Sequence, residues 1–272
     1  MKKLRFISGL LIVALTGCAE NVPKPEPAKT VAKDTVAKTP VDTSKVFSGK
    51  TVPVLCYHAI RQSLKGDSAE QKAYSVSPEN FAMQMKTLAD SGYQSVTPDQ
   101  VRDYYTKGVA LPEKPIVISF DDGRKDQFTI AAVEMEKHNL RGVFYIMTVS
   151  LGKKNYMSRD DVRALADKGH IIGLHTWDHQ MVTKYKTADD WNLQITKPRK
   201  MLEGLTQKPV TSFAYPYGVW NIAATDSLKS RGFTTAFIFF GKQDPSRPMY
   251  TLERINGPDT GNMEKFMKRI GG

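Results

Sequence analysis

The stretch Pro115-Ile116-Val117-Ile118-Ser119-Phe120-Asp121-Asp122-Gly123 joins an apolar, β-branched run to two adjacent carboxylates. Residues 116–120 are apolar on both faces, which is typical of a parallel-sheet strand that is covered on both sides. Asp121 and Asp122 follow at its C-terminal end, the edge where α/β folds place their chemistry. Because adjacent carboxylates repel, we expect a cation to neutralise one and leave the other to accept a proton. A plain Asp-Asp-Gly turn is the alternative.

The composition is that of an ordinary globular protein with a mild positive charge. The 272 residues include 39 basic and 28 acidic side chains, a net charge of +11. Residues 1–18 hold three basic residues and residues 19–50 hold six Lys against four acids, which leaves 30 basic and 24 acidic residues, or +6. This charge suits an anionic envelope or glycan. No cluster of Arg and Lys is interleaved with aromatic residues, so we expect no nucleic-acid partner.

The N-terminus has the features of an exported lipoprotein. A basic start precedes an apolar run that ends at Leu15 and is too short to span a membrane. Leu15-Thr16-Gly17-Cys18 resembles a bacterial lipobox, so residues 1–18 are expected to be a signal peptide and Cys18 the lipidated residue; a plain signal peptide with a chance Cys is the alternative. Ala19 is not the Asp associated with inner-membrane retention, which favours the outer membrane if the cell is diderm.

One folded domain is expected behind a linker. Residues 19–50 are rich in Pro, Lys and Thr and cannot offset their ordering entropy by burial, so they predict a flexible tether. Residues 51–272 are long enough for a full-size core. Cys56 lies in an apolar run and is interpreted as a core residue, without a disulfide.

Alternating strands and helices predict parallel βα units. Seven or eight such units in about 220 residues favour an incomplete (β/α) barrel, with a doubly wound open sheet as the alternative. The expected strands cover residues 52–58, 93–96, 116–120, 143–147, 171–174, 210–215, 234–239 and 250–255. The expected helices run from 78 to near 91, 98 to 106, 130 to near 139, 159 to 168, 188 to 205 with a break at Pro198, 222 to 230 and 263 to 269.

Polar residues stand at the C-terminal ends of several expected strands, and these ends converge on one face of a parallel barrel. They are His58, the two aspartates, His175 and the segment 215–218. His175 and His179 are four residues apart, so one helical turn would direct both imidazoles to one point. Two His and one Asp with open positions are the pattern of a catalytic zinc-type site.

Three motifs resemble the polysaccharide deacetylases, the NodB-like carbohydrate esterase family 4. They are Ser119-Phe120-Asp121-Asp122-Gly123, His175-Thr176-x-x-His179 and Phe213-Ala214-Tyr215-Pro216-Tyr217-Gly218. The resemblance implies an incomplete barrel and metal-dependent removal of acetyl groups from N-acetylglucosamine polymers. It implies that Asp122, His175 and His179 hold the metal, with Asp121 as the general base. Tyr215, Pro216 and Tyr217 would line the groove, with the backbone or Tyr217 holding the oxyanion, and Trp177 would stack on a sugar or simply pack.

Two parts of the family pattern are missing. Many members have an acid His in a late Leu-x-x-His motif and an Arg in the third motif, whereas this chain has no His after His179 and has Ala214 at the Arg position. His58 is the remaining candidate acid, as in the subgroup that includes the poly-N-acetylglucosamine deacetylases; a groove residue is the alternative. Arg254 could replace the missing Arg, although a surface position is the simpler expectation.

The expected protein is a lipid-anchored, monomeric N-deacetylase of peptidoglycan or poly-N-acetylglucosamine that uses a divalent ion. Zinc is expected, and cobalt, nickel or manganese could take its place. The alternatives are an acetyl-ester hydrolase of xylan-type glycans and a glycan-binding lipoprotein that has lost turnover. Retention of Asp121 argues against the last, because a protein that only holds a metal needs only Asp122.

Overall fold

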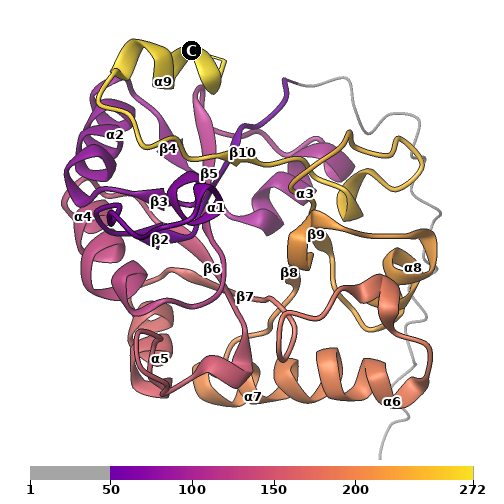
Figure 1. Ribbon diagram of the computed structural model, residues 1–272. Helices are drawn as coiled ribbons and strands as arrows, with labels where there is room; N and C mark the ends of the chain where they lie inside the picture. Colours follow the sequence, from indigo (N-terminus) through magenta and orange to yellow (C-terminus); the bar gives the residue numbers. More distant parts are fainter. Residues whose placement is uncertain (1–49, 272) are drawn as a thin grey trace, which may run out of the picture. The chain divides into compact units, whose positions relative to one another are not determined.

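Parallel β-strands form the frame of residues 50–271, the part of the chain that the computed structural model describes (Figure 1). Seven strands follow one another in the order β10-β1-β5-β6-β7-β8-β9, and β4 pairs with β5 beside this path. Their bounds are Val54–Tyr57 (β1), Gln94–Ser95 (β4), Pro115–Phe120 (β5), Gly142–Ile146 (β6), Ile171–Leu174 (β7), Ser212–Ala214 (β8), Thr235–Phe237 (β9) and Ile255–Asn256 (β10).

The strands separate two hydrophobic cores because successive side chains point to opposite faces. One face packs beneath the helices, and its members include Leu55, Ile118 and Phe144. The other face forms the inner cluster, in which Val54 of β1 belongs with Phe237 of β9 although the two strands are far apart in the sheet order. The sheet is therefore curled, and the expectation that residues 116–120 are covered on both faces is confirmed.

The end of the chain closes the curled sheet. Leu252 exchanges backbone hydrogen bonds with Ala236 and Ile238 beside β9, at 3.1 and 2.9 Å. A few residues later, β10 pairs with β1, and the Gly257 N–H donates to the Cys56 carbonyl at 2.9 Å. One segment thus joins both edges of the sheet. The predicted incomplete barrel is confirmed, and the open doubly wound sheet is not what the chain forms.

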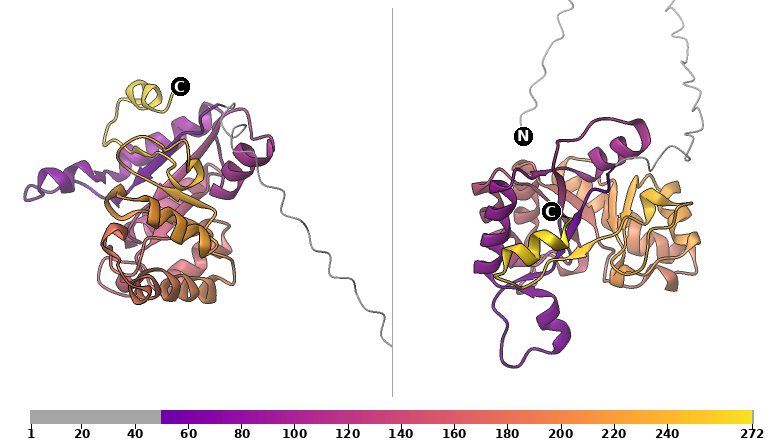
Figure 2. Two further views of the ribbon diagram at one scale, coloured as in Figure 1. Left: turned by 90° about the vertical axis from the view of Figure 1, so that its right-hand side faces the viewer. Right: turned by 90° about the horizontal axis from the view of Figure 1, so that it is seen from above.

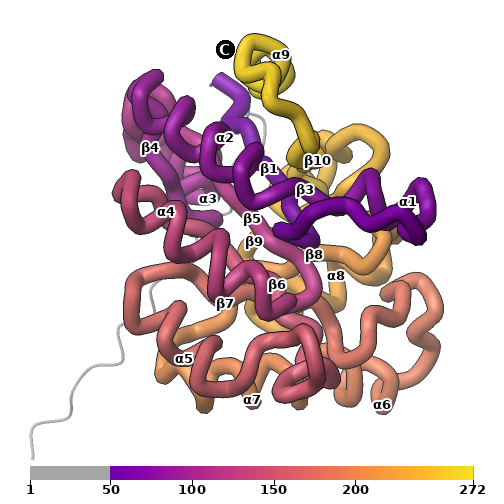
Figure 3. The backbone as a smooth tube through the Cα atoms, turned by 60° about the vertical axis from the view of Figure 1, so that its left-hand side comes forward, coloured from indigo at the N-terminus to yellow at the C-terminus, as the bar shows by residue number. Residues whose placement is uncertain are grey.

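Helices cover the outside of this barrel, and Figure 3 shows α2, α4, α5 and α7 following one another around it. Several begin where capping residues predicted them: Ser77, Thr97 and Ser158 each accept a backbone N–H at a helix start. The helices are α1 (Ala69–Ala73), α2 (Pro78–Asp90), α3 (Pro98–Lys107), α4 (Val133–Lys137), α5 (Arg159–Asp167), α6 (Ala188–Trp191), α7 (Lys197–Thr206), α8 (Ile222–Ser230) and α9 (Met263–Arg269).

Two expected helices contain π-helical turns. Gln127–Ala132 precedes α4, and Asn192–Thr196 lies between α6 and α7. The second turn ends just before Pro198, whose ring nitrogen has no hydrogen to donate within a helix. The interruption expected at Pro198 is thus a π-helical turn just before it, and the backbone stays helical through the proline.

The sequence analysis missed an arm between β1 and α2. Its elements are β2 (Ala59–Ile60), α1 and β3 (Ser75–Val76), with β2 and β3 paired in parallel. Figure 2 shows this indigo arm standing out from the barrel. α1 buries none of its residues, so it has no apolar periodicity that a sequence pattern could have detected.

The expected last strand, 250–255, is wrong in its extent. Pro248–Tyr250 is a 3₁₀ turn, and the strand that pairs with β1 covers only Ile255–Asn256. Among residues 50–271, no helix is both long and apolar enough to cross a membrane. The expected signal peptide and almost all of the expected linker lie outside the described residues.

Candidate active site

The C-terminal ends of the strands surround a cleft of about 400 Å³, where the predicted polar residues meet. The parallel pairing of β1, β5, β6, β7, β8 and β9 brings these ends to one face. Of the predicted site residues within the described part of the chain, His58, Asp121, Asp122, His175, His179, Tyr215 and Tyr217 line this cleft.

Asp122, His175 and His179 direct their ligand atoms at one another. The Oδ1 atom of Asp122 lies 3.6 Å from His175 Nε2 and 3.8 Å from His179 Nε2. One ligand atom from each of the three lies within 4.8 Å of the others. Two imidazole nitrogens and one carboxylate oxygen at such separations suit a divalent metal ion with open coordination positions. The donor set therefore fits the expected metal.

The surroundings of the two imidazoles favour ring forms that can bind a metal. His175 is 1 % exposed, and its Nδ1 lies 2.8 Å from the Ala214 carbonyl. Because a carbonyl can only accept, Nδ1 carries the proton and the Nε2 lone pair remains free. Burial lowers the pKa of His179 to about 4, so its ring is neutral at pH 7, as a metal ligand must be.

The predicted helical turn between the two histidines is wrong. Residues 176–178 form a turn. Thr176 at its start and His179 directly after it have φ angles of 68° and 69°. The Thr176 hydroxyl accepts the His179 N–H at 2.9 Å and closes this turn. Of the seven non-glycine residues with positive φ in the described chain, Asp122, His179 and Tyr217 line this cleft, and Thr176 follows the lining residue His175. Such angles cost about 1–3 kcal/mol each and mark backbone held for function.

Asp121 has a different partner from its neighbour. Arg254 NH1 and NH2 donate to its two oxygens at 2.7 and 2.8 Å, and both side chains are buried. The expectation of a surface position for Arg254 is therefore wrong, because the closing segment directs this side chain into the barrel. Burial alone raises the pKa of Asp121, but the Arg254 guanidinium outweighs burial and holds that pKa well below its usual range.

His58 stands beside Asp121 on the active face. Its Nε2 lies 3.8 Å from Asp121 Oδ2, and its side chain is 19 % exposed. Its ring packs against Tyr74 and Phe239, with centroid distances of 4.6 and 5.7 Å. Burial lowers the pKa of His58 and outweighs the opposite effect of the Asp121 carboxylate.

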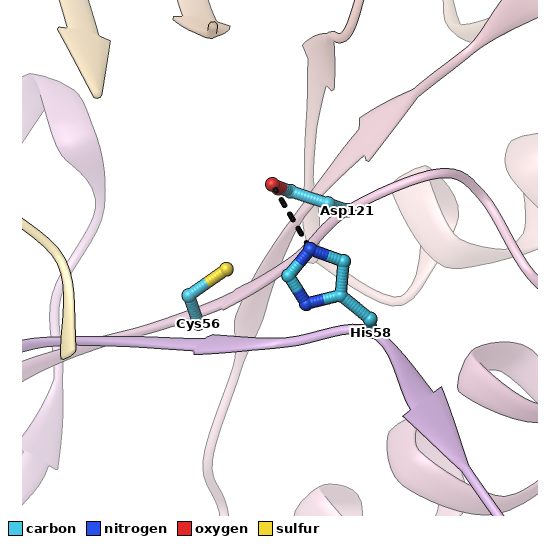
Figure 4. Close-up of side chains that lie close together, drawn as sticks. All are labelled: Cys56, His58 and Asp121. Atoms are coloured by element: carbon cyan, nitrogen blue, oxygen red, sulfur yellow. Dashed lines mark ion pairs between the residues drawn. The ribbon is translucent and has the colours of Figure 1, made fainter. Parts of the chain in front are cut away.

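A second group of possible metal ligands, Cys56, His58 and Asp121, appears in Figure 4. Two facts argue against a metal there. Both Asp121 oxygens already accept hydrogen bonds from the Arg254 guanidinium, whose charge would repel a cation. Burial raises the pKa of the Cys56 thiol, which therefore stays protonated at neutral pH. Cys56 is buried and makes no disulfide within residues 50–271.

The expected groove residues divide into two groups. Tyr215, Tyr217 and Gly218 line the cleft, whereas Pro216 and Trp177 do not. The Tyr217 ring is half exposed, and its centroid lies 4.5 Å from that of His179. A Cβ on Gly218 would lie 2.5 Å from the Phe239 backbone nitrogen, so only glycine permits this close approach.

Several cleft residues were missed from the sequence. Phe239 and Phe240 follow β9 at the same edge as the other site residues, so their position was a usable clue. Phe240 is 62 % exposed and packs edge-on against Phe239, with centroids 4.8 Å apart. Tyr74 and Glu70 also line the cleft and come from the missed arm, for which the sequence offered no such clue.

Comparisons with known proteins agree with this architecture. The polysaccharide deacetylase family model matches residues 108–236. YxkH of Bacillus subtilis, which is named for that family, is 27% identical over 270 residues, 94% of this chain and 93% of its own length. The poly-beta-1,6-N-acetyl-D-glucosamine N-deacetylase of Staphylococcus aureus is 24% identical over 90% of this chain and 92% of its own. The crystal structure of BC0361, a polysaccharide deacetylase from Bacillus cereus, superposes with a TM-score of 0.70 at 26% identity, covering 81% of this chain and 69% of that one.

Proposed function

From the match of the polysaccharide deacetylase model to residues 108–236 and the near full-length similarity to YxkH, we propose that this chain is a polysaccharide deacetylase and that it hydrolyses the acetamide group of N-acetylglucosamine residues in a polysaccharide. The observation that carries the proposal is that two adjacent aspartates have different partners at one cleft. Asp122 faces two imidazoles and is available to bind a metal, whereas Asp121 is hydrogen-bonded to the buried Arg254. Holding a metal needs only Asp122 and the two imidazoles, so a second, ionised carboxylate at the same cleft favours a hydrolase.

We assign the metal to Asp122, His175 and His179, with zinc as the proposed ion and cobalt, nickel or manganese as substitutes. When bound, such an ion polarises the acetyl carbonyl and lowers the pKa of a coordinated water. The chain's contribution is a fixed set of two imidazole nitrogens and one carboxylate oxygen, with the His175 tautomer set by the Ala214 carbonyl.

Asp121 is our proposed general base. Its carboxylate is ionised in the folded protein, so it can accept a proton from the attacking water. The two hydrogen bonds from Arg254 keep it from rotating, which fixes the direction from which the proton is taken. The water oxygen bonds to the acetyl carbon, and the carbonyl oxygen gains the negative charge. We assign the backbone of residues 215–218 or the Tyr217 side chain to that oxyanion.

His58 is our proposed general acid. The carbon–nitrogen bond can break only if the leaving nitrogen receives a proton, since an amide anion is a very poor leaving group. Among the imidazoles of the cleft, His58 is the one without a metal role, and it stands on the Asp121 side. The products are acetate and a glucosamine residue, with the proton taken at Asp121 balanced by the proton given at His58.

Two finer proposals concern the substrate and the location. We propose poly-β-1,6-N-acetylglucosamine as the polymer, supported by the near full-length match to the Staphylococcus aureus enzyme and by His58 in place of a late His. Peptidoglycan is the second candidate. We also propose that the protein is exported and anchored through lipidated Cys18, in the outer membrane if the cell is diderm.

The test is acetate release by the metal-replete chain from poly-β-1,6-N-acetylglucosamine oligomers, peptidoglycan, chitooligosaccharides and acetylxylan. We expect release from the N-acetylglucosamine oligomers, and a loss of about 10²–10⁴-fold for Asp121→Asn with the metal still bound. Asp90→Asn, an exposed change on α2, is the control.

Preference for acetylxylan would identify an ester hydrolase, and an unaffected Asp121→Asn would contradict the assigned base. Binding of glycan without any acetate release would indicate a binding lipoprotein.

A further inference from the structure

The side chain of Gln127 joins the backbones of the proposed acid and base. Gln127 is fully buried, and its Nε2 donates to the His58 carbonyl at 2.7 Å and to the Asp121 carbonyl at 2.5 Å. We propose that Gln127 is a positioning residue that fixes the separation of His58 and Asp121. This inference rests on the proposed function for its catalytic consequence, although the geometric part can be tested without turnover.

The two carbonyls need such a partner because the β-ladder stops just before them. The last bond between β1 and β5 runs from the Asp121 N–H to the Tyr57 carbonyl at 3.0 Å. Beyond it the chain turns away, with positive φ angles at Asp122 and Gly123. Within residues 50–271, Gln127 makes the only hydrogen bond recorded to either carbonyl. One amide group therefore connects the two strand ends where the β-ladder has no further hydrogen bond.

The orientation of this amide follows from chemistry. If the amide were flipped, Oε1 would face two carbonyl oxygens and could not bond to either. In the orientation present, Oε1 is buried without a partner in the described chain. An unsatisfied buried acceptor costs about 1–3 kcal/mol, which an apolar side chain of similar shape would avoid. The amide accepts this cost at one oxygen and in return supplies the donor for two carbonyls, which ties the His58 and Asp121 backbones to one group.

The expected consequence is a loss of rate more than of binding. His58 Nε2 and Asp121 Oδ2 are 3.8 Å apart, and each belongs to a residue whose carbonyl Gln127 holds. Without the bridge, the two strand ends can shift relative to each other. A misplacement of about 1 Å can cost about 10²-fold in rate. Gln127 does not line the cleft, so substrate binding should change little.

Gln127→Met tests the inference, and Gln84→Met is its matched control. Gln84 is also fully buried, and it bridges the Pro258 carbonyl and the Tyr57 hydroxyl at 2.7 Å each, away from the cleft. We expect Gln127→Met to lower kcat by about 10–100-fold with KM within about threefold and full metal content. Gln84→Met should lower the melting temperature comparably and leave kcat unchanged. An equal loss of kcat in both variants would overturn the inference.

Crystal structures of the variants supply a readout that needs no activity. In Gln127→Met, the distance between His58 and Asp121 should differ from wild type, and in Gln84→Met it should not. If Gln127→Met does not fold, Gln127→Asn keeps the amide but is one methylene too short to reach both carbonyls. An unchanged distance in the folded variant would overturn the inference, even if the wild-type chain released no acetate and the proposed function failed.

Discussion

Two neighbouring aspartates acquire different chemistry because the backbone turns between them. Asp121 ends the buried face of β5 and is 2 % exposed, so its side chain enters the barrel beside Arg254. Asp122 has a φ of 78°, which carries its side chain to the two imidazoles instead. An extended backbone would have placed the two carboxylates on opposite faces of the strand. The left-handed turn at Asp122 is thus what allows both carboxylates to serve one cleft.

The Asp121–Arg254 pair gives a prediction for stability. Among residues 50–271, Arg254 is the one arginine or lysine bonded to the buried Asp121 carboxylate, so we expect Arg254→Met to lower the free energy of unfolding by about 3–5 kcal/mol. Asp121→Asn leaves a buried guanidinium instead and should also be costly. The double variant removes both charges and should be more stable than Arg254→Met, although it is inactive. Urea denaturation of the four proteins measures this coupling; additive losses would show that the pair is not coupled.

Sequence patterns located the site residues at strand ends but not their partners. His58, Asp121 and His175 were predicted from the points where apolar runs stop, and all three line the cleft. The turn between the histidines was predicted as helical because spacing alone does not reveal positive φ angles. The surface expectation for Arg254 was wrong because it lies 133 residues from Asp121 in the chain. Gln127 was missed because a side chain that bonds to two carbonyls leaves no pattern in the sequence.

At the scale of elements, local rules set most helix boundaries. α8 and α9 begin and end as predicted, and Ser158 and Gly169 bounded α5 to within one residue. The strand over 171–174 was predicted correctly, whereas those over 52–58, 210–215 and 234–239 were predicted too long because the apolar runs continue beyond the ladder. The arm carrying α1 was missed because its helix packs no apolar face against the barrel. Helices were therefore predicted where the sequence has a buried apolar face, with or without a capping residue, and the helix α1, which has no buried face, was missed.

The start of α5 gives a prediction of pH dependence. Asp161 accepts hydrogen bonds from the Ser158 N–H at 2.7 Å and from Lys125 Nζ at 2.6 Å, and so ties α5 to the loop that follows the two aspartates. Partial burial alone raises the pKa of Asp161, but the bonds from Lys125 and Ser158 outweigh it and lower that pKa. A depressed folded-state pKa stabilises the fold above the unfolded value of about 3.9, and this stabilisation is lost as the pH falls through the folded-state pKa.

Asp161→Asn should therefore lower the free energy of unfolding by about 0.5–1 kcal/mol at pH 7, a modest figure because Lys125 is partly exposed. The difference from wild type should shrink as the pH falls below about 4. Asp160→Asn is the control, because Asp160 is in the same turn but its pair with Arg163 is largely exposed. Urea denaturation from pH 3 to pH 7 measures both variants. A difference for Asp161→Asn that is constant with pH would contradict the assigned charge effect.

At the scale of the whole folded domain, closure of the sheet and assembly of the site are one event. The segment from Leu252 to Gly257 bonds to β9 at one end and to β1 at the other. Arg254 lies between these two attachments, so its side chain reaches Asp121 only when both are made. The base can therefore acquire its cation only after the chain has folded to its last strand. This arrangement links the proposed activity to the complete barrel.

The proposed anchor gives a prediction for the protein in its cell. With Cys18 lipidated as proposed, we expect membrane attachment to depend on its acyl chains, each buried CH₂ of which contributes about 0.8 kcal/mol. Cys18→Ser should move the protein from the membrane pellet to the soluble fraction. Its kcat on soluble oligomers should not change, because every proposed catalytic and metal-binding residue lies between His58 and Arg254. Cys56→Ala changes the chain's other cysteine and should leave the protein in the pellet. A Cys18→Ser protein that still sedimented with membranes would rule out this cysteine as the anchor.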